Sequence, residues 1–356
     1  MLRNPVHFVC PTEKIWRELQ GGEFPLMSTK RLTECSGGIL NSWVVRTYYQ
    51  LGLAGARVTT SPSPRRDSIN IVSVRDFGRK DRPIDAFIVI PRGDAHDPKL
   101  ADFVIEQNAQ NPETSTRSSV PHWPQPGILP RDPSRGFRVD RVSFKGRTNN
   151  LDEGFRSQAF IDDLSKLGIQ LELDTIDGLL GSHNWNDYRQ CDAVIAVRNM
   201  RGNTASAKPA SKLVNAWHAN TIPMLGPEPA YRELKRSTLD YIEIYNPGDA
   251  LRALKLLNAN PALFEKIVEN GRVRCQEFTD ERITQRWIEL LNGPVSDAFE
   301  HWKRKGLVEK LFGYVRMMRE EQRSKQRYVD EIRSGPLLLD SAARHETLYD
   351  APRHST

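Results

Sequence analysis

Lys208 and Lys212 lie on either side of an expected helix start, where lysines are unfavourable unless they meet an anion. Pro209 suits the first position of a helix, because its ring fixes φ and its missing N–H would be unpaired there anyway. Apolar Leu213 and Trp217 then follow at helical spacing. Because a helix N-terminus carries partial positive charge, the lysines and the free backbone N–H groups together suit a phosphate or pyrophosphate. The alternative is that both lysines are solvated surface residues.

Further charged side chains follow neighbouring apolar runs that we expect to be strands of one parallel sheet. Ligands of such sheets lie in the loops at the carboxyl ends of the strands, so we expect these side chains to converge. The cations would stabilise the negative charge that develops on a leaving nucleotide diphosphate, and a carboxylate would accept hydrogen bonds from ribose hydroxyls. The candidates are Lys145, Arg147, Arg198, Arg201, Glu228 and Glu233, with Tyr231 as a further cleft residue.

Asp94 and His96 are candidates for catalysis, because they follow the apolar run 86–90 of the N-terminal half. A histidine with an ordinary pKa of about 6.5 could take a proton from an acceptor hydroxyl. The alternative is a loop in which the two side chains cap each other or are solvated.

Three other residues are candidates for the acceptor side of a cleft. Gly37 and Gly38 could let an acceptor or a phosphate approach the backbone at a helix start, although a plain turn would also need them. Gln125 lies in a proline-rich segment that could either line the cleft or serve only as a rigid connection.

The elements expected to position these residues alternate between strands and helices. Such alternation of short apolar runs with amphipathic segments is typical of parallel sheets covered by helices on both faces. In the second half we expect strands at 141–144, 169–173, 193–197, 222–225 and 241–245, and helices at 151–167, 185–190, 209–220, 230–236, 247–257 and 260–292. In the first half we expect a helix within 37–55 and strands at 69–74, 86–90 and 102–108.

This pattern predicts an α/β protein with two Rossmann-like domains that face a cleft. The expected boundaries are 1–137 and 138–292, with a proline-rich linker at about 120–137. A helical extension over 293–335 would pack back toward the N-terminal domain, and the polar tail 336–356 would be mobile.

Composition limits the possible classes of protein. The 356 residues carry a net charge of +6, and no run approaches the roughly 20 apolar residues that span a membrane. The N-terminus lacks the apolar core of a signal peptide, and the four cysteines form no close pair, so we expect reduced thiols in the cytoplasm. The modest positive charge suits small anionic ligands better than nucleic acid.

The second half resembles the GT-B glycosyltransferases, especially the nucleotide-sugar-binding domain of the retaining, glycogen-synthase-like kind. The resemblance covers about residues 138–292 and rests on FKGR at 144–147, DAVIAVR at 192–198, KPASKLVNAW at 208–217 and PMLGPEPAYREL at 223–234. The two glutamates that this family carries around the last loop are spaced differently here, at Glu228 and Glu233.

The resemblance implies a metal-independent, retaining transferase that moves a hexose from a nucleotide-diphosphate sugar to a hydroxyl acceptor such as a glycan. Arg147 with Lys208 or Lys212 would bind the donor phosphates, and Glu228 or Glu233 the ribose. The donor would be a substrate, and no further cofactor is expected. Two alternatives remain, a nucleotide-sugar epimerase of the same fold and a non-enzymatic interaction protein that uses the basic helical segment 301–333 on lipid or nucleic acid.

Overall fold

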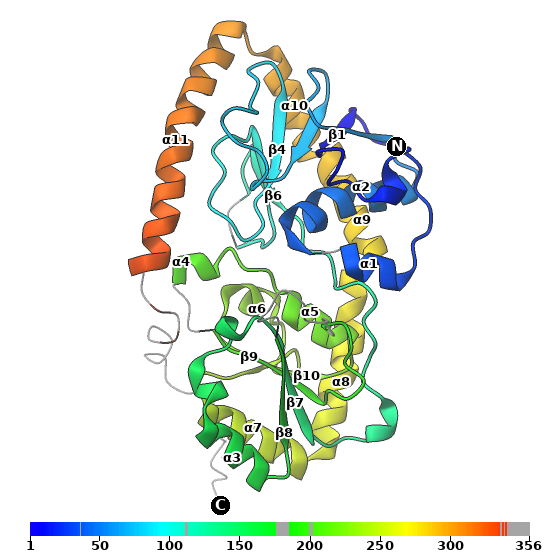
Figure 1. Cartoon of the computed structure of the whole chain (residues 1–356), viewed down its shortest axis with the longest axis vertical. Coiled ribbons are helices and arrows are strands. Elements are labelled where there is room, and N and C mark those ends of the chain that lie inside the picture. Colours follow the sequence, from blue (N-terminus) through cyan, green and yellow to red (C-terminus); the bar gives the residue numbers. More distant parts are fainter. Residues whose placement is uncertain are drawn as a thin grey trace, which may run out of the picture.

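The computed structural model describes residues 1–35, 37–110, 113–175, 185–198, 202–334, 337 and 339. These residues form two α/β units that lie one above the other along the long axis of the molecule (Figure 1). The expected tail 336–356 lies outside the described residues, apart from 337 and 339. Among the described residues, no helix combines the length and the apolar character needed to cross a membrane.

The N-terminal unit contains a six-stranded parallel sheet with the order β2-β1-β3-β4-β5-β6. The runs INIV and FIVIP form fully buried central strands, as expected for apolar β-branched segments covered on both faces. The sequence did not predict β1, β2 and β6. The strands are β1 (Val6–Val9), β2 (Val58–Ser61), β3 (Ile69–Val72), β4 (Phe87–Pro91), β5 (Phe103–Glu106) and β6 (Arg117–Ser119).

The C-terminal unit contains a five-stranded parallel sheet with the order β11-β10-β9-β7-β8. All five strands were expected from the sequence, although β11 is shorter than its apolar run. They are β7 (Arg141–Gly146), β8 (Gln170–Thr175), β9 (Ala193–Ala196), β10 (Ile222–Leu225) and β11 (Ile242–Glu243).

Helices cover both sheets, and most of them agree with the sequence pattern. The π-helix Leu40–Val45 runs directly into α2, so the expected helix within 37–55 is confirmed. The others are α1 (Thr29–Cys35), α2 (Arg46–Leu53), α3 (Gln158–Lys166), α4 (Gly202–Ala205), α5 (Ser211–His218), α6 (Pro229–Leu234), α7 (Pro247–Ala259), α8 (Pro261–Cys275), α9 (Asp280–Asn292), α10 (Pro294–Arg304) and α11 (Leu307–Ser334).

Three local expectations were wrong. The helix predicted over 151–167 begins only at Gln158, because the Ser157 hydroxyl caps it by accepting a hydrogen bond from Phe160 N. No helix forms at 185–190, where the backbone instead pairs with the linker at Leu129. Helix α5 begins at Ser211, so Pro209 lies before the helix instead of at its first position.

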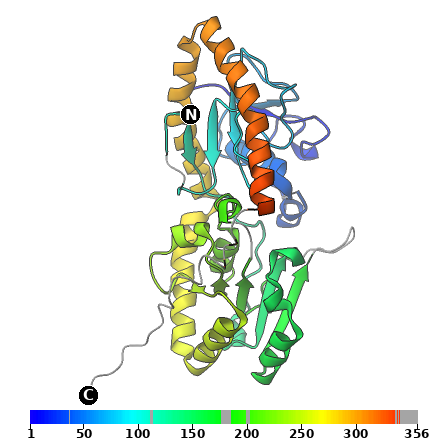
Figure 2. The ribbon, with the colours of Figure 1, turned by 90° about the vertical axis from the view of Figure 1, so that its left-hand side faces the viewer.

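The last three helices return to the N-terminal unit. Helix α9 contacts α2, and α10 contacts β3. The Phe299 ring lies 5.3 Å from that of Phe87 in β4, between ring centroids, and Trp302 lies beside them. Helix α11 then runs down one side of the same unit (Figures 1 and 2). The C-terminal part of the chain therefore completes the core of the N-terminal unit.

Candidate functional site

A pocket of about 250 Å³ lies between the two units. The N-terminal unit contributes Ser42 and Arg46, and the linker contributes residues 122–126. The C-terminal unit contributes the end of β7 and the start of α5. The residues on that side include Lys145, Gly146, Arg147, Asn150, Tyr188, Ser211, Lys212 and Asn215. This pocket brings together three of the sequence-predicted donor residues, Lys145, Arg147 and Lys212, with Gln125 of the linker.

Lys212 is the most unusual charged group of the pocket. Its Nζ donates to the Lys145 carbonyl oxygen at 2.7 Å and lies 5.3 Å from the centroid of the Phe144 ring. Burial, followed by repulsion from Arg198 and Lys208, lowers its pKa from 10.5 to about 7, although Glu228 partly opposes this change. A cation in this position has a strong electrostatic reason to bind an anion.

Lys208 extends toward the other unit. Its Nζ lies 2.8 Å from Oδ2 of Asp94, so this ion pair crosses the interface. Burial alone would raise the pKa of Asp94, but the charge and hydrogen bond of Lys208 outweigh it and hold the pKa below its ordinary value. The structure thus places the predicted catalytic carboxylate directly against a predicted phosphate ligand.

Arg198, Glu228 and Tyr231 form a buried polar cluster, of which Arg198 and Glu228 act electrostatically on Lys212. Nε of Arg198 lies 3.5 Å from Oε1 of Glu228, whose side chain is fully buried. Within the described part of the chain, Arg198 Nε, both Glu228 oxygens and the Tyr231 hydroxyl have no hydrogen-bond partner. Because buried polar groups are normally paired, this cluster has capacity to bind water or a polar ligand.

Two other predicted site residues, His96 and Glu233, are engaged in contacts with other parts of the protein. His96 is buried, with Nε2 2.7 Å from Glu321 Oε1 of α11, so the histidine faces that helix and not the pocket. Glu233 accepts hydrogen bonds from the backbone N–H groups of Ala109 and Gln110 at 2.8 and 3.0 Å, which engages it in the contact between the units.

Gly37 and Gly38 are exposed at the start of the π-helix, outside the residues that line the pocket. Gly38 adopts φ of 83°, which explains the need for glycine there. Gln125 lies at the pocket, and its backbone N–H donates to Asn215 Oδ1 at 3.1 Å. The predicted ligand Arg201 lies outside the described residues.

The sequence did not single out Arg46 and Asn215. Arg46 is 2% exposed, and its guanidinium donates to the Pro124 carbonyl and to Asp280 Oδ1, both at 2.7 Å. Both residues interrupt apolar runs, WVVR at 43–46 and LVNAW at 213–217, which is a signal that could have identified them.

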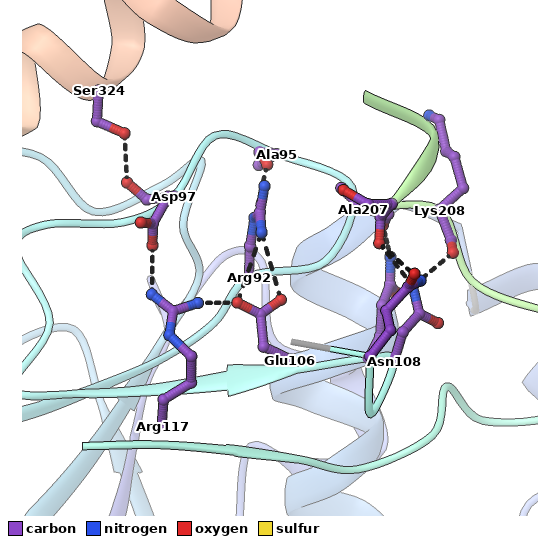
Figure 3. Close-up of polar contacts among 12 residues, drawn as sticks. Arg92, Ala95, Asp97, Glu106, Asn108, Arg117, Ala207, Lys208 and Ser324 are labelled. Atoms are coloured by element: carbon purple, nitrogen blue, oxygen red, sulfur yellow. Dashed lines mark hydrogen bonds and ion pairs between the residues drawn. The ribbon is translucent and has the colours of Figure 1, made fainter. Parts of the chain in front are cut away.

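Polar contacts join the two units (Figure 3). Nδ2 of Asn108, at the end of β5, donates to the carbonyl oxygens of Ser206 and Lys208 at 2.9 and 2.8 Å. Gln107 Nε2 donates to the Ala207 carbonyl. The segment that carries Lys208 is therefore fixed by side chains of the N-terminal unit.

No cluster of three or more histidine, cysteine, aspartate or glutamate side chains suited to a metal ion occurs in the described ranges.

No protein-family model and no curated protein matches the chain. Solved structures do match it. Sucrose-phosphate synthase from Thermosynechococcus elongatus aligns over 81% of this chain and 98% of its own, with 11% identity and a TM-score of 0.50. HepE of Anabaena, solved with UDP and glucose, aligns over 81% and 99% with 13% identity and a TM-score of 0.46. The alignment with TarM covers 70% of this chain but only 58% of TarM, with 11% identity and a TM-score of 0.45.

These likenesses concern the fold. Two parallel sheets covered by helices, in two units with a pocket between them, make up the GT-B arrangement, and the chain has the GT-B fold. The fold class expected from the sequence is confirmed.

Proposed function

We propose that this protein transfers a glycosyl group from a nucleotide-diphosphate sugar to a hydroxyl acceptor. The observation that carries the proposal is the ammonium group of Lys212 at the pocket, whose pKa is lowered to about 7 by burial first and then by the nearby Arg198 and Lys208. A diphosphate would compensate this concentration of positive charge. The GT-B fold supports the same reading, because it is the fold of enzymes that use such donors.

The donor diphosphate would lie between Lys212, Arg147 and the N-terminus of α5. No described side chain caps α5, so its first backbone N–H groups can bind an anion in addition to the helix dipole. Glu228, whose oxygens lack hydrogen-bond donors among the described residues, would accept from hydroxyls of the sugar or ribose. As the bond between the anomeric carbon and the phosphate oxygen breaks, these cations would stabilise the charge on the leaving diphosphate.

The acceptor would approach from the N-terminal unit. Donor phosphate would compete with Asp94 for Lys208, since both anions attract the same ammonium group. Release of Asp94 would leave a carboxylate at the interface to accept the proton of the acceptor hydroxyl as its oxygen bonds to the anomeric carbon, on the same face that the diphosphate leaves. His96 would act indirectly in this scheme, by holding the loop of Asp94 against α11.

Three finer features complete the proposal and rest on the family resemblance. The transferred group would be a hexose, its anomeric configuration would be retained, and no cofactor beyond the donor would be needed. Cations would take the role that a metal plays in other transferases, so activity should survive excess EDTA. Loss of activity in EDTA would contradict metal independence, and NMR of the product would show whether the configuration is retained.

Ligand-dependent thermal unfolding tests the proposal. The panel consists of UDP, GDP, ADP and CMP and their sugar conjugates, and nucleotides of one base should stabilise the protein. The expected stabilisation is about 2.7 kcal/mol when the ligand concentration is 100 times the dissociation constant. The shift should shrink in Lys208→Ala combined with Lys212→Ala. It should persist in Lys255→Ala combined with Lys266→Ala, a matched pair of exposed lysines on α7 and α8. No shift with any nucleotide, or an epimerised donor formed without acceptor, would contradict the proposal.

A further inference from the structure

The first half of α11 exposes a row of large apolar side chains, which we call the apolar stripe. Its five residues recur at positions that share one face of a helix. Such side chains scattered singly are ordinary on a protein surface, but a contiguous row on one helix indicates a contact surface. The stripe consists of Leu307, Val308, Leu311, Phe312 and Val315, with exposed fractions of 74%, 67%, 48%, 74% and 40%.

The stripe lies at one extremity of the molecule. The turn between α10 and α11 forms the upper end of the long axis, on the side of the N-terminal unit that is remote from the C-terminal sheet (Figures 1 and 2). A flat partner could therefore reach the stripe without meeting the rest of the protein.

The second half of α11 is anchored, so the stripe is held in a fixed direction. Met318 is buried, and Ser324 Oγ donates to the Asp97 carbonyl at 2.7 Å. Glu321 accepts from His96 and from Lys99 N, and the Tyr328 hydroxyl donates to the Asp94 carbonyl at 3.2 Å. These contacts occupy the face of the helix that meets the N-terminal unit, whereas the side chains of the stripe, on a neighbouring face, remain exposed.

Cations border the stripe. Residues 303–316 contain five lysine or arginine side chains and a single carboxylate, Glu309. Lys303 pairs with Glu300 at 2.8 Å and Lys305 lies 3.9 Å from Glu309, but both lysines remain about one-third or more exposed. Lys310 lies over the Trp302 ring, with Nζ 3.8 Å from the centroid. This end of the molecule thus combines exposed apolar side chains with an excess of positive charge over residues 303–316.

We propose that the start of α11 docks this protein on an acidic phospholipid surface. Acyl chains would bury the stripe, and lipid phosphates would neutralise the cations, whose long side chains can reach the headgroups. A nucleic acid offers the phosphates but no apolar medium for Leu311 and Phe312. A second copy of the chain offers an apolar face but brings the same positive charges against it.

Vesicle flotation with the full chain tests this inference. Vesicles of phosphatidylcholine mixed with phosphatidylglycerol should bind the protein at least about tenfold more tightly than phosphatidylcholine alone, a modest part of what five cations near an anionic surface contribute. The preference should weaken as salt is raised. Leu311→Asp combined with Phe312→Asp should reduce binding to the mixed vesicles by at least about tenfold, since charged groups do not enter the acyl region.

The control uses the same chemistry elsewhere on the molecule. Leu256→Asp combined with Val273→Asp replaces residues of α7 and α8 that are 52% and 63% exposed, and it should leave vesicle binding unchanged. Equal losses in the two double variants, equal binding to both kinds of vesicle, or no binding to either would overturn the proposal. So would light scattering that shows a dimer which the Leu311 and Phe312 changes dissociate, because the stripe would then be a protein interface.

Discussion

The buried ammonium group of Lys212 is unfavourable for folding. Replacing Lys212 should therefore stabilise the ligand-free protein and, at the same time, remove its response to the ligand. Burial is the largest cause of its lowered pKa. We expect Lys212→Met to raise the free energy of unfolding of the ligand-free protein by roughly 1–4 kcal/mol, as when other buried charges are replaced by apolar groups. The same change should abolish stabilisation by nucleotide diphosphates. Urea denaturation with and without nucleotide measures both effects, and a variant that is less stable yet still binds would contradict the assignment.

The titration of Lys212 should also make the free energy of unfolding depend on pH. Below about pH 7, Lys212 is protonated in the folded and unfolded states alike. Between about pH 7 and 10.5 the unfolded chain binds more protons at this position than the folded protein does, so Lys212 makes stability rise with pH in this interval. The advantage of Lys212→Met should therefore be largest at neutral pH and shrink in alkaline buffer. Parallel pH profiles of the two proteins would show that Lys212 titrates normally.

Individual pocket residues could be predicted from the sequence where a charged side chain follows an expected strand or stands at an expected helix start. Lys145, Arg147 and Lys212 stand at the carboxyl ends of strands or at a helix start, and they share one pocket. His96 stands at an equivalent place in the N-terminal unit, but Glu321 lies 225 positions away in the sequence and draws its ring toward α11. A local pattern cannot reveal a partner that only the tertiary fold brings near.

At the scale of elements, Asp192 joins the linker to the second sheet. Its fully buried carboxylate accepts from Arg131 and Arg135, at 2.7 to 2.8 Å, and from the backbone N–H of Asp140 and Arg141. Asp192→Asn should destabilise the protein by about 3–5 kcal/mol, because two buried or half-buried arginines lose their counter-charge. Asp187→Asn, in the ion pair of the half-buried Asp187 with the exposed Arg189, is the control and should cost less than about 1 kcal/mol.

Glu321 is one of several side chains of α11 that hydrogen-bond the loop 94–99, beside Ser324 and Tyr328. Glu321→Ala removes the acceptor of His96 Nε2 and of Lys99 N, and each buried donor left unpaired should cost about 1–3 kcal/mol. Hydrogen exchange over residues 307–334 should rise, whereas Gln322→Ala, on the exposed face of the same helix, should leave it unchanged. Unaltered exchange in the Glu321 variant would mean that packing alone holds the helix.

Elements were predictable from the sequence where apolar periodicity was long and undisturbed. The central strands β3, β4, β9 and β10 are short apolar runs and were all expected. Strand β2 reads VTTS and β6 reads RSS, so polar edge strands gave no apolar run to find. The helix expected at 185–190 does not form, because Leu129 of the linker supplies backbone hydrogen-bond partners for this segment. This pairing arises where the two units meet.

At the scale of the whole molecule, alternating strands and helices predicted two Rossmann-like units, but not how they close on each other. Closure depends on contacts between segments about 100 positions apart, such as Asn108 with the carbonyls of Ser206 and Lys208. Glu233 illustrates the difference: the sequence suggested a ribose ligand, and the structure shows it bound to Ala109 N and Gln110 N across the interface.

Asn108→Ala should loosen this closure without removing any proposed phosphate ligand. The loss of two hydrogen bonds should disfavour the closed arrangement by about 1–3 kcal/mol, so small-angle scattering should show a larger radius of gyration. Nucleotide affinity should change little, because Lys212 stays in place. Water should reach the donor more often, and hydrolysis should therefore rise relative to transfer. Asn258→Ala is the matched control, since its amide also bonds backbone, at Val139, but inside the C-terminal unit. It should lower stability and leave the ratio of hydrolysis to transfer unchanged; the same ratio in both variants would show that Asn108 does not govern closure.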